Sequence, residues 1–206
     1  MTDLFVCGTD TGCGKTVVTA ALAAVLGAPD VTVVKPVQTG CPPDDDAAWV
    51  ASVTGCRTEV WARYREPLAP AVCAEREGRP LDVDDLIERT VAVRSRHRIV
   101  EAAGGLLAPL TRDTTMADLA TGIGWPVVVA ARPGLGTLNH TALTVEACAR
   151  RDLTVTGIVV SGYRGGLVEE TNLEGLAAIA PLIGVVDWCE DWSRLAAHTR
   201  IAIPDR

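Results

Sequence analysis

Residues 8–16 read GTDTGCGKT, and this stretch stands between two apolar segments. The segment in front of it, residues 4–7 (LFVC), has the composition of a short buried strand. The segment behind it, residues 16–26 (TVVTAALAAVL), is apolar on nearly every side, as expected for a helix that packs against a sheet. Glycines let the loop backbone curl so that successive N–H groups face one anion, and the start of the helix adds a favourable dipole. A strand, a glycine-rich loop and a helix in this order predict a phosphate-binding loop.

Lys15 and Thr16 end this loop with the two side chains that a bound nucleoside triphosphate needs. A lysine at this place reaches the β- and γ-phosphates, and the hydroxyl that follows it binds Mg²⁺. The usual pattern has four residues between its first glycine and the Gly-Lys pair. Here Thr9 holds that first position and Gly8 comes one residue earlier, so the loop is a variant form. The nucleotide-binding residues predicted from the loop are Gly12, Cys13, Gly14, Lys15 and Thr16.

The composition indicates one globular domain over residues 1–206. With 48% hydrophobic and 22% charged residues the chain is not disordered, and a domain of this length buries roughly 70% of its unfolded surface. No run approaches the ~20 apolar residues that span a bilayer, and the first residues contain no basic segment of a secretory signal. The net charge of −7 disfavours nucleic acid as a partner. We therefore expect a cytoplasmic protein that binds neither nucleic acid nor a membrane.

Strand-like apolar runs alternate with helical patterns along the rest of the chain. This alternation predicts an α/β fold of the P-loop NTPase type, with a mostly parallel sheet, helices on both faces and ligands at the carboxyl ends of the strands. Residues 31–35 are expected to form a strand that Pro36 closes, and residues 55–70 are expected to be irregular. Thr115 and Asp118 resemble a helix capping box. Further strands are predicted over residues 98–101, 126–131, 155–160 and 183–186, and further helices over 47–53, 83–94 and 139–150.

Three charged side chains next to predicted strands are candidates for the site. Glu101 ends an apolar strand, where packing gives no reason for a lone acid, and Asp46 opens a helix after the second strand. With the Thr16 hydroxyl they are the predicted Mg²⁺ ligands, because Mg²⁺ prefers one or two carboxylates beside a hydroxyl and waters. The aspartates at 44–46 could instead be a solvated first helix turn. Lys35 could direct its ammonium at the phosphate loop, where phosphoryl transfer needs positive charge, or could extend from the strand end into solvent.

The seven cysteines indicate neither a disulfide framework nor a zinc site. Their number is odd, none forms Cys-x-x-Cys, and the three histidines are not at metal-ligand spacing. Several lie in apolar segments, so we interpret them as small core residues.

The chain resembles the dethiobiotin synthetase family over nearly its whole length. The resemblance rests on GTDTGCGKT (8–16), KPVQTG (35–40), the aspartate before a helix at 46, EAAGG (101–105) and LGTLNH (135–140), in this order and spacing. Enzymes of that family form the ureido ring of dethiobiotin from 7,8-diaminononanoate, CO2 and ATP. The resemblance implies the same activity here.

The resemblance also implies a role for each candidate residue. One substrate amine would capture CO2 as a carbamate, which Lys35 and Lys15 would hold near the γ-phosphate. ATP would convert the carbamate to a mixed carbamic-phosphoric anhydride, and the second amine would close the ring with loss of phosphate. Thr11 and Thr39 would contact the phosphate or the carbamate. Thr16, Asp46 and Glu101 would hold Mg²⁺.

In the family, the substrate carboxylate binds at the start of the helix that follows LGTLNH, in a site that the neighbouring subunit of a homodimer contributes. A helix N-terminus offers free N–H groups to such an anion. The implied substrate-binding residues are Gly136, Leu138 and Asn139. We interpret His140 as a helix residue near the interface and not as a catalytic base.

Two positions depart from the family pattern. Ala102 replaces the first glycine of EGAGG, and a methyl group is tolerable there unless the residue needs a positive φ or touches a ligand. Ser161 stands where many relatives carry an asparagine that reads adenine, so the nucleotide base would meet a different side chain.

Two other classes of ATP-using protein fit the sequence less well. Partition and positioning ATPases carry a second lysine five residues before the loop lysine, and here that position is Asp10. They also need a basic amphipathic segment to dock on a membrane, which the chain lacks. Amide-forming enzymes of cofactor synthesis with a related loop carry an added glutamine-hydrolysing domain, for which 206 residues are too few.

Overall fold

The computed structural model describes residues 1–204, so the last two positions of the predicted domain, 205 and 206, lie outside it. Its strands are β1 (Thr2–Gly8), β2 (Val31–Gln38), β3 (Arg57–Arg63), β4 (His97–Glu101), β5 (Val127–Ala131), β6 (Val155–Tyr163), β7 (Leu182–Asp187) and β8 (Thr199–Ile201). Its α-helices are α1 (Lys15–Val25), α2 (Asp46–Thr54), α3 (Pro70–Arg76), α4 (Val83–Val91), α5 (Met116–Ile123), α6 (Thr137–Ala149) and α7 (Leu167–Ile179). Two 3₁₀-helices, η1 (Ala28–Asp30) and η2 (Trp192–His198), complete the described elements.

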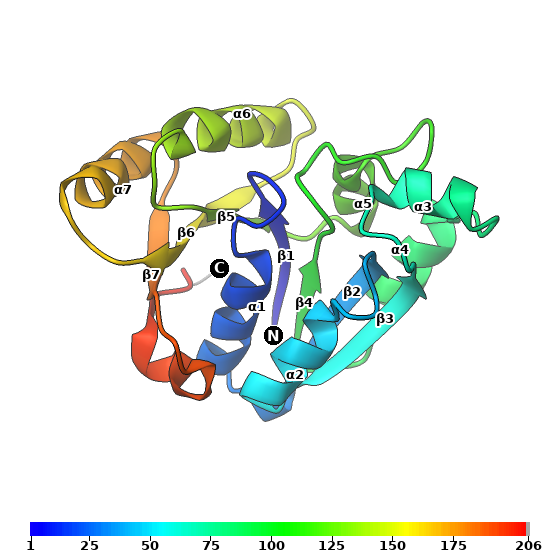
Figure 1. Ribbon diagram of the computed structural model, residues 1–206, viewed down its shortest axis with the longest axis horizontal. Helices are drawn as coiled ribbons and strands as arrows, with labels where there is room; N and C mark the ends of the chain where they lie inside the picture. Colours follow the sequence, from blue (N-terminus) through cyan, green and yellow to red (C-terminus); the bar gives the residue numbers. More distant parts are fainter. Residues whose placement is uncertain (205–206) are drawn as a thin grey trace.

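Within the described part of the chain, the strands form one sheet in the order β3-β2-β4-β1-β5-β6-β7-β8 (Figure 1). Strands β1 to β7 run parallel, and β8 pairs antiparallel with β7 at one edge. The carboxyl end of β1 lies in the middle of the sheet, where the chain order reverses between β4 and β5. Ligands of open α/β sheets bind at such a point. The sheet topology confirms the predicted fold class.

Helices cover both faces of the sheet because side chains of each strand alternate between two hydrophobic cores. On β1, Leu4 and Val6 pack in the core that holds α1, α2 and η2. Their neighbours Phe5 and Cys7 pack in the core that holds α3 to α7. Strands buried on both faces explain the continuous apolar runs of the sequence.

Strand β2 does not end at Pro36, as the sequence had suggested, but continues to Gln38. Proline lacks the N–H that a sheet ladder needs. The ladder between β2 and β4 ends at Val34, and the pairing with β3 includes Lys35 and Val37 without Pro36. Pro36 therefore follows the last residue of β2 that pairs with β4. The strand can continue through it, because no pairing recorded at this position needs its N–H.

The expectation that residues 55–70 are irregular was wrong, because they contain β3 and the start of α3. β3 is the edge strand of the sheet, and its residues are half-buried or exposed along its whole length. Charged side chains at 57, 59 and 63 suit an exposed edge, where they oppose pairing with another chain, and they hide the apolar pattern of a strand.

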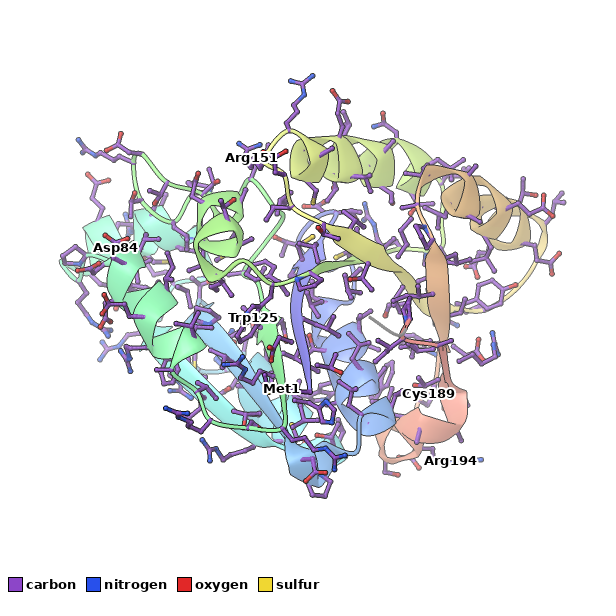
Figure 2. The ribbon with its side chains drawn as sticks, turned by 180° about the vertical axis from the view of Figure 1, so that it is seen from behind. Met1, Asp84, Trp125, Arg151, Cys189 and Arg194 are labelled. Carbon is purple, nitrogen blue, oxygen red and sulfur yellow. The ribbon has the colours of Figure 1, made fainter. Side chains whose placement is uncertain are left out.

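The C-terminal part adds α7, η2 and β8, which the sequence pattern did not predict. Figure 2 labels Cys189 and Arg194 in the segment between β7 and β8, at the side of the sheet opposite β3. The capping box of α5 is confirmed, with Thr115 and Asp118 bonded reciprocally. All seven cysteines are free, and six of them are buried. No helix among residues 1–204 is long and apolar enough to cross a membrane.

Candidate active site

The loop between β1 and α1 has the backbone of an anion-binding turn. Gly12 and Gly14 have φ angles of 72° and 93°, in the left-handed region that favours glycine. A Cβ at Gly14 would lie 2.6 Å from the Cβ of Ser161 on β6 and closer still to its hydroxyl, so the loop packs directly on that strand. Cys13 buries its side chain in the core beneath the loop. Its backbone alone is therefore available to a ligand.

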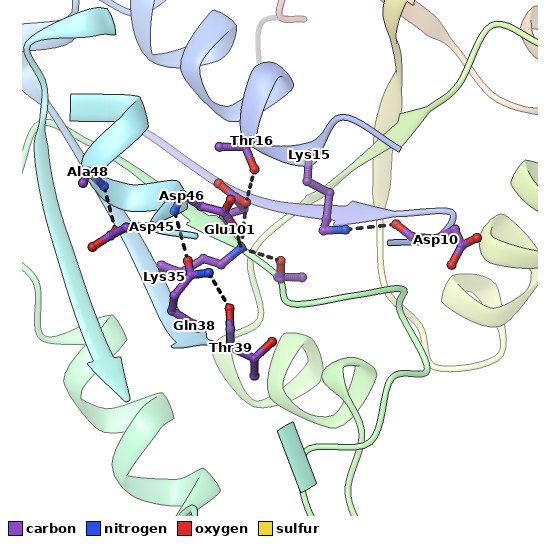
Figure 3. A network of polar contacts seen from close by, with 11 residues as sticks. Asp10, Lys15, Thr16, Lys35, Gln38, Thr39, Asp45, Asp46, Ala48 and Glu101 are labelled. Atoms are coloured by element: carbon purple, nitrogen blue, oxygen red, sulfur yellow. Dashed lines mark hydrogen bonds and ion pairs between the residues drawn. The ribbon is translucent and has the colours of Figure 1, made fainter. Parts of the chain in front are cut away.

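Lys15 lies over this loop, and its ammonium donates one hydrogen bond to the backbone carbonyl of Asp10 at 3.0 Å (Figure 3). The Asp10 carboxylate accepts a hydrogen bond from the N–H of Thr11 at 2.7 Å. Asp10 thus holds the loop through its own carboxylate and holds the lysine through its carbonyl. An anion bound in the loop would replace a single hydrogen bond of Lys15.

Lys35 is enclosed by acceptors in the second half of β2. Its Nζ lies 2.6 Å from Oδ2 of Asp46 and 2.7 Å from Oε1 of Glu101, and it donates a longer bond of 3.3 Å to the carbonyl of Ala102 (Figure 3). The Thr16 hydroxyl donates to the same Oε1 of Glu101 at 2.9 Å. The Lys35 and Glu101 side chains are only 4% and 1% exposed. Four predicted site residues therefore meet in one buried cluster.

Strand register brings these groups together. β2 pairs with β4 at Val34 and Val100, so the next residues, Lys35 and Glu101, are neighbours whose side chains point to the opposite face. Ile99, two residues before Glu101, packs in the core with α1. The lysine and the acid therefore face the helices α1 and α2, whose first turns supply Thr16 and Asp46.

Burial and the neighbouring charges have opposite effects on the pKa values of Lys35 and Asp46. Burial lowers the pKa of Lys35, but the carboxylates of Glu101 and Asp46 outweigh it and raise that pKa above its ordinary value. Burial likewise raises the pKa of Asp46, and the ammonium of Lys35 outweighs it, so that the pKa of Asp46 is lowered. Both side chains are therefore charged at neutral pH.

The oxygens around Lys35 fit a magnesium ion. Oε2 of Glu101 is buried and has no hydrogen-bond partner, although a buried carboxylate oxygen ordinarily has one. Among residues 1–204 no group of three or more His, Cys, Asp or Glu side chains is arranged to hold a metal ion by itself, so the Thr16 hydroxyl would have to complete the donor set. The two carboxylates and the Thr16 hydroxyl form an oxygen-only donor set, which suits a hard cation such as Mg²⁺.

Gln38 was not among the predicted site residues, yet it orients the start of α2. Its buried amide accepts a hydrogen bond from the N–H of Asp46 at 3.2 Å and donates to the carbonyl of Thr39 at 2.9 Å. Asp45 caps the same helix by accepting from the N–H of Ala48 at 2.9 Å. The available signal in the sequence was a glutamine three residues after Lys35, in the segment KPVQTG.

A cleft of about 1280 Å³ opens above these residues. Its walls come from the phosphate loop, the end of β2, residues 103–108 after β4, the start of α2, residues 67–70 and one side of α6, where His140 and Leu143 lie. Sequence reasoning missed the wall over residues 67–70, because it depends on how β3 and α3 pack. The predicted residues that line the cleft are Thr11, Gly12, Gly14, Lys15, Thr16, Lys35, Thr39 and Asp46.

The other predicted residues lie outside this cleft. Gly136, Leu138 and Asn139 are exposed at the first turn of α6 and do not line it. Ser161 is buried behind the phosphate loop. Ala102 is also buried, and because Asp152 is the only non-glycine residue with a positive φ among residues 1–204, alanine is accommodated there without backbone strain.

A second hollow of about 480 Å³ lies at the ends of β6 and β7, two residues beyond Ser161. The guanidinium of Arg164 lies 4.2 Å from the ring centre of Trp188, within the range of a cation–π contact. Asp187 and Arg200 form a two-point ion pair at 2.6 and 2.8 Å. The hollow therefore combines an aromatic ring with paired charges.

The sequence is similar to one protein family and to named proteins of other organisms. The family model described as "AAA domain" matches residues 2–195. The chain is 47% identical over 171 residues to a protein of Anaeromyxobacter sp. (strain K), covering 78% of this chain and 77% of that protein. It is 46% identical over 197 residues to a protein of Mycobacterium avium (strain 104), covering 90% and 87%. Both relatives are named ATP-dependent dethiobiotin synthetase BioD.

Solved structures agree on the fold at much lower identity. The septum site-determining protein MinD of Pyrococcus horikoshii, complexed with Mg-ADP, has a TM-score of 0.58 at 17% identity and covers 90% of this chain and 81% of its own. Chloroplast FtsY of Physcomitrella patens has a TM-score of 0.61 at 16% identity, with coverage of 98% and 62%. These similarities support the fold and do not favour one activity over another.

Proposed function

Because this chain belongs to the ATP-dependent dethiobiotin synthetase family, we propose that its residues 1–206 form one catalytic domain, with the cleft above Lys35 as the active site. The chain is an enzyme of biotin biosynthesis that uses ATP to make dethiobiotin from the diamine and CO2. One observation carries the assignment of the site. Lys35 meets two carboxylates, one of which also accepts from the Thr16 hydroxyl, and Lys15 lies over the phosphate loop of the same cleft.

In the first step, one amine of 7,8-diaminononanoate attacks the carbon of CO2 and loses a proton, which gives a carbamate. A carbamate oxygen then attacks the γ-phosphorus of ATP, the bond to ADP breaks, and a mixed carbamic-phosphoric anhydride forms. Lys15 and Lys35 hold the two anions together and neutralise the charge that develops on the phosphoryl oxygens. Thr11 and Thr39 donate hydrogen bonds to the same anions from the cleft wall.

In the second step, the other amine attacks the carbonyl carbon of the anhydride. The bond from that carbon to the phosphate oxygen breaks, phosphate leaves, the attacking amine loses a proton to solvent, and the ureido ring closes. The nucleophiles belong to the substrate, so the protein supplies position and positive charge and needs no nucleophile of its own.

Thr16, Asp46 and Glu101 would hold Mg²⁺, which neutralises phosphate charge when it is bound. The unpartnered Oε2 of buried Glu101 supports this assignment. The nucleotide base would extend along β6 past Ser161 toward the hollow at the ends of β6 and β7.

The substrate carboxylate would bind at the first turn of α6 through Gly136, Leu138 and Asn139 of a second subunit. Their exposure supports a site completed by another chain. Leu135 and Leu167 are 86% and 80% exposed on the segments around α6 and α7, which favours a homodimer through this face. The free cysteines support a reducing, cytoplasmic location.

Phosphate release from Mg-ATP, measured with and without the diamine and bicarbonate, tests the function. Release should require both co-substrates and should match the amount of a new cyclic urea detected by mass spectrometry. Phosphate release at the same rate with and without the diamine would favour a switch ATPase of the partition type. Sedimentation analysis tests the homodimer, which a charged residue at Leu167 should dissociate.

A further inference from the structure

We propose that Lys35 is the resident counter-cation of the metal site, which leaves the carboxylates of Asp46 and Glu101 for the cleft only when a divalent cation and a nucleotide phosphate bind together. This inference rests on the proposed assignment of Thr16, Asp46 and Glu101 as the metal ligands. In this proposal Lys35 binds first the carboxylates of Asp46 and Glu101 and then the nucleotide phosphate. Its ammonium can therefore take part in the reaction only after the nucleotide has bound.

The first observation is that Lys35 has no donor to spare. An ammonium has three N–H donors, and Lys35 faces three acceptors, Oδ2 of Asp46, Oε1 of Glu101 and the carbonyl of Ala102. With all three donors engaged, it cannot bind a carbamate or a γ-phosphate without giving up at least one. The proposed catalytic role of Lys35 therefore requires its ammonium to move.

The second observation is that a metal would share its two carboxylates with Lys35. Oε1 of Glu101 accepts from both Lys35 and Thr16, and Asp46 has its Oδ2 only 2.6 Å from the ammonium. Oε2 of Glu101 is free, but a metal bound there and at Asp46 would still lie close to the ammonium, and two cations held by the same two carboxylates repel each other strongly in a buried site. A carboxylate with a 1% exposed side chain also cannot stay without a counter-ion. The two cations are therefore expected to exchange with one another.

The third observation is that the ammonium has somewhere to go. Lys35 lines the cleft, beside Thr39 and opposite the phosphate loop. Its four-carbon stem is flexible and carries a compact charge that can be redirected. An anion bound in the loop would receive the displaced ammonium, so the metal and the phosphate should favour each other's binding, and each should bind less well alone.

Lys15 provides a matched comparison in the same cleft. Its Nζ bonds to a single carbonyl, that of Asp10, and touches no carboxylate. Replacing either lysine by methionine removes one positive charge. Only the change at Lys35 frees the oxygens of Asp46 and Glu101.

The test is the affinity of nucleotide-free protein for Mn²⁺, measured by electron paramagnetic resonance and repeated with a non-hydrolysable ATP analogue. Lys35→Met should bind Mn²⁺ alone about tenfold or more tighter than the wild type, and the analogue should then add less to the affinity than it does for the wild type. Lys35→Arg, which keeps a cation, should behave like the wild type, and Lys15→Met should show no gain. Unchanged affinity in Lys35→Met, or an equal gain in Lys15→Met, would overturn the proposal.

The outcomes separate this proposal from the assignment of the metal site. If the wild type binds Mn²⁺ with the analogue while Lys35→Met gains nothing alone, only the exchange is wrong. If no protein binds Mn²⁺ under any condition, the metal ligands are wrong and the exchange fails with them. Should Lys35→Met not fold, nitrogen NMR of the wild-type lysine ammonium groups decides instead. The Lys35 signal should move when Mg²⁺ and the analogue are added together, and a signal unmoved by the pair contradicts the exchange.

Discussion

Alanine at Gly14 tests whether the phosphate loop is held by packing on β6 as well as by its backbone conformation. Gly14 has a φ of 93°, and a Cβ there would overlap the side chain of Ser161. Gly12, two residues earlier, has a φ of 72°, and a Cβ there would extend into open space. The two substitutions add the same atom to the same loop and differ in what that atom meets.

The expected magnitudes follow from this difference. An L-residue in the left-handed region costs about 1–2 kcal/mol, which is the whole expected loss for Gly12→Ala. Overpacking a well-filled site adds about 1–3 kcal/mol, so Gly14→Ala should lower the free energy of unfolding by about 2–5 kcal/mol. With a urea m-value of about 2 kcal/mol/M, the unfolding midpoint of Gly14→Ala should fall by roughly 1–2.5 M.

Removing the Ser161 side chain should restore only the part of the free energy of unfolding that overpacking costs. In the double variant Gly14→Ala/Ser161→Gly, the loss relative to Ser161→Gly should return to that of Gly12→Ala, because backbone strain is all that remains. Urea unfolding of the four variants without nucleotide, followed by circular dichroism, measures each midpoint. Equal losses for Gly12→Ala and Gly14→Ala, or no recovery in the double variant, would refute the idea that β6 holds the loop.

Three further variants test the site and its scaffold. Lys35→Gln should reduce turnover about 100- to 1000-fold while the affinity for an ATP analogue, measured by calorimetry, changes little; turnover within tenfold of the wild type would remove Lys35 from the mechanism. Arg98→Gln is the control for Lys35→Gln. It breaks the ion pair between Arg98 and Asp3 (2.7 and 2.8 Å), which lies at the other end of β1 and β4 from the site. This variant should lower the melting temperature by about 6–12 °C and leave kcat unchanged. Hydrogen bonds from Thr115 lower the pKa of Asp118, so its stabilisation is present above its unfolded pKa and is lost as pH falls through the folded one. Asp118→Asn should therefore cost about 1 kcal/mol at pH 7, in thermal melts, and progressively less below about pH 4.

Local patterns in the sequence predicted the parts of the site that lie next to one another along the chain. The phosphate loop needs only a strand, a glycine-rich turn and a helix in succession, and the structure confirms all three. Acidic and basic residues at strand ends were also informative, because parallel strands bring their carboxyl ends to one edge of the sheet. That rule predicts that Lys35 and Glu101 lie at the same edge of the sheet, where Nζ of the lysine is 2.7 Å from Oε1 of the acid.

Features that depend on neighbours in space were not predictable in the same way. β3 is an edge strand with few apolar residues, and its periodicity is weak because one side of it faces solvent. Pro36 suggested a strand end, since nothing in the sequence says that pairing with β4 has already stopped at Val34. Ser161 was expected at the nucleotide, and its packing against Gly14 follows from the order of β1, β5 and β6.

The contact between Lys35 and Glu101 shows why the order of strands matters more than their number. These residues are 66 positions apart and become neighbours only because β2 lies directly beside β4. Side chains alternate along a strand, so a shift of one residue in this register would turn the lysine toward the opposite core and leave the acid without a counter-ion. A buried acid without a partner costs several kcal/mol. The register that favours folding is therefore the one that assembles the cluster, and the ion pair stabilises the arrangement that the proposed reaction must partly open.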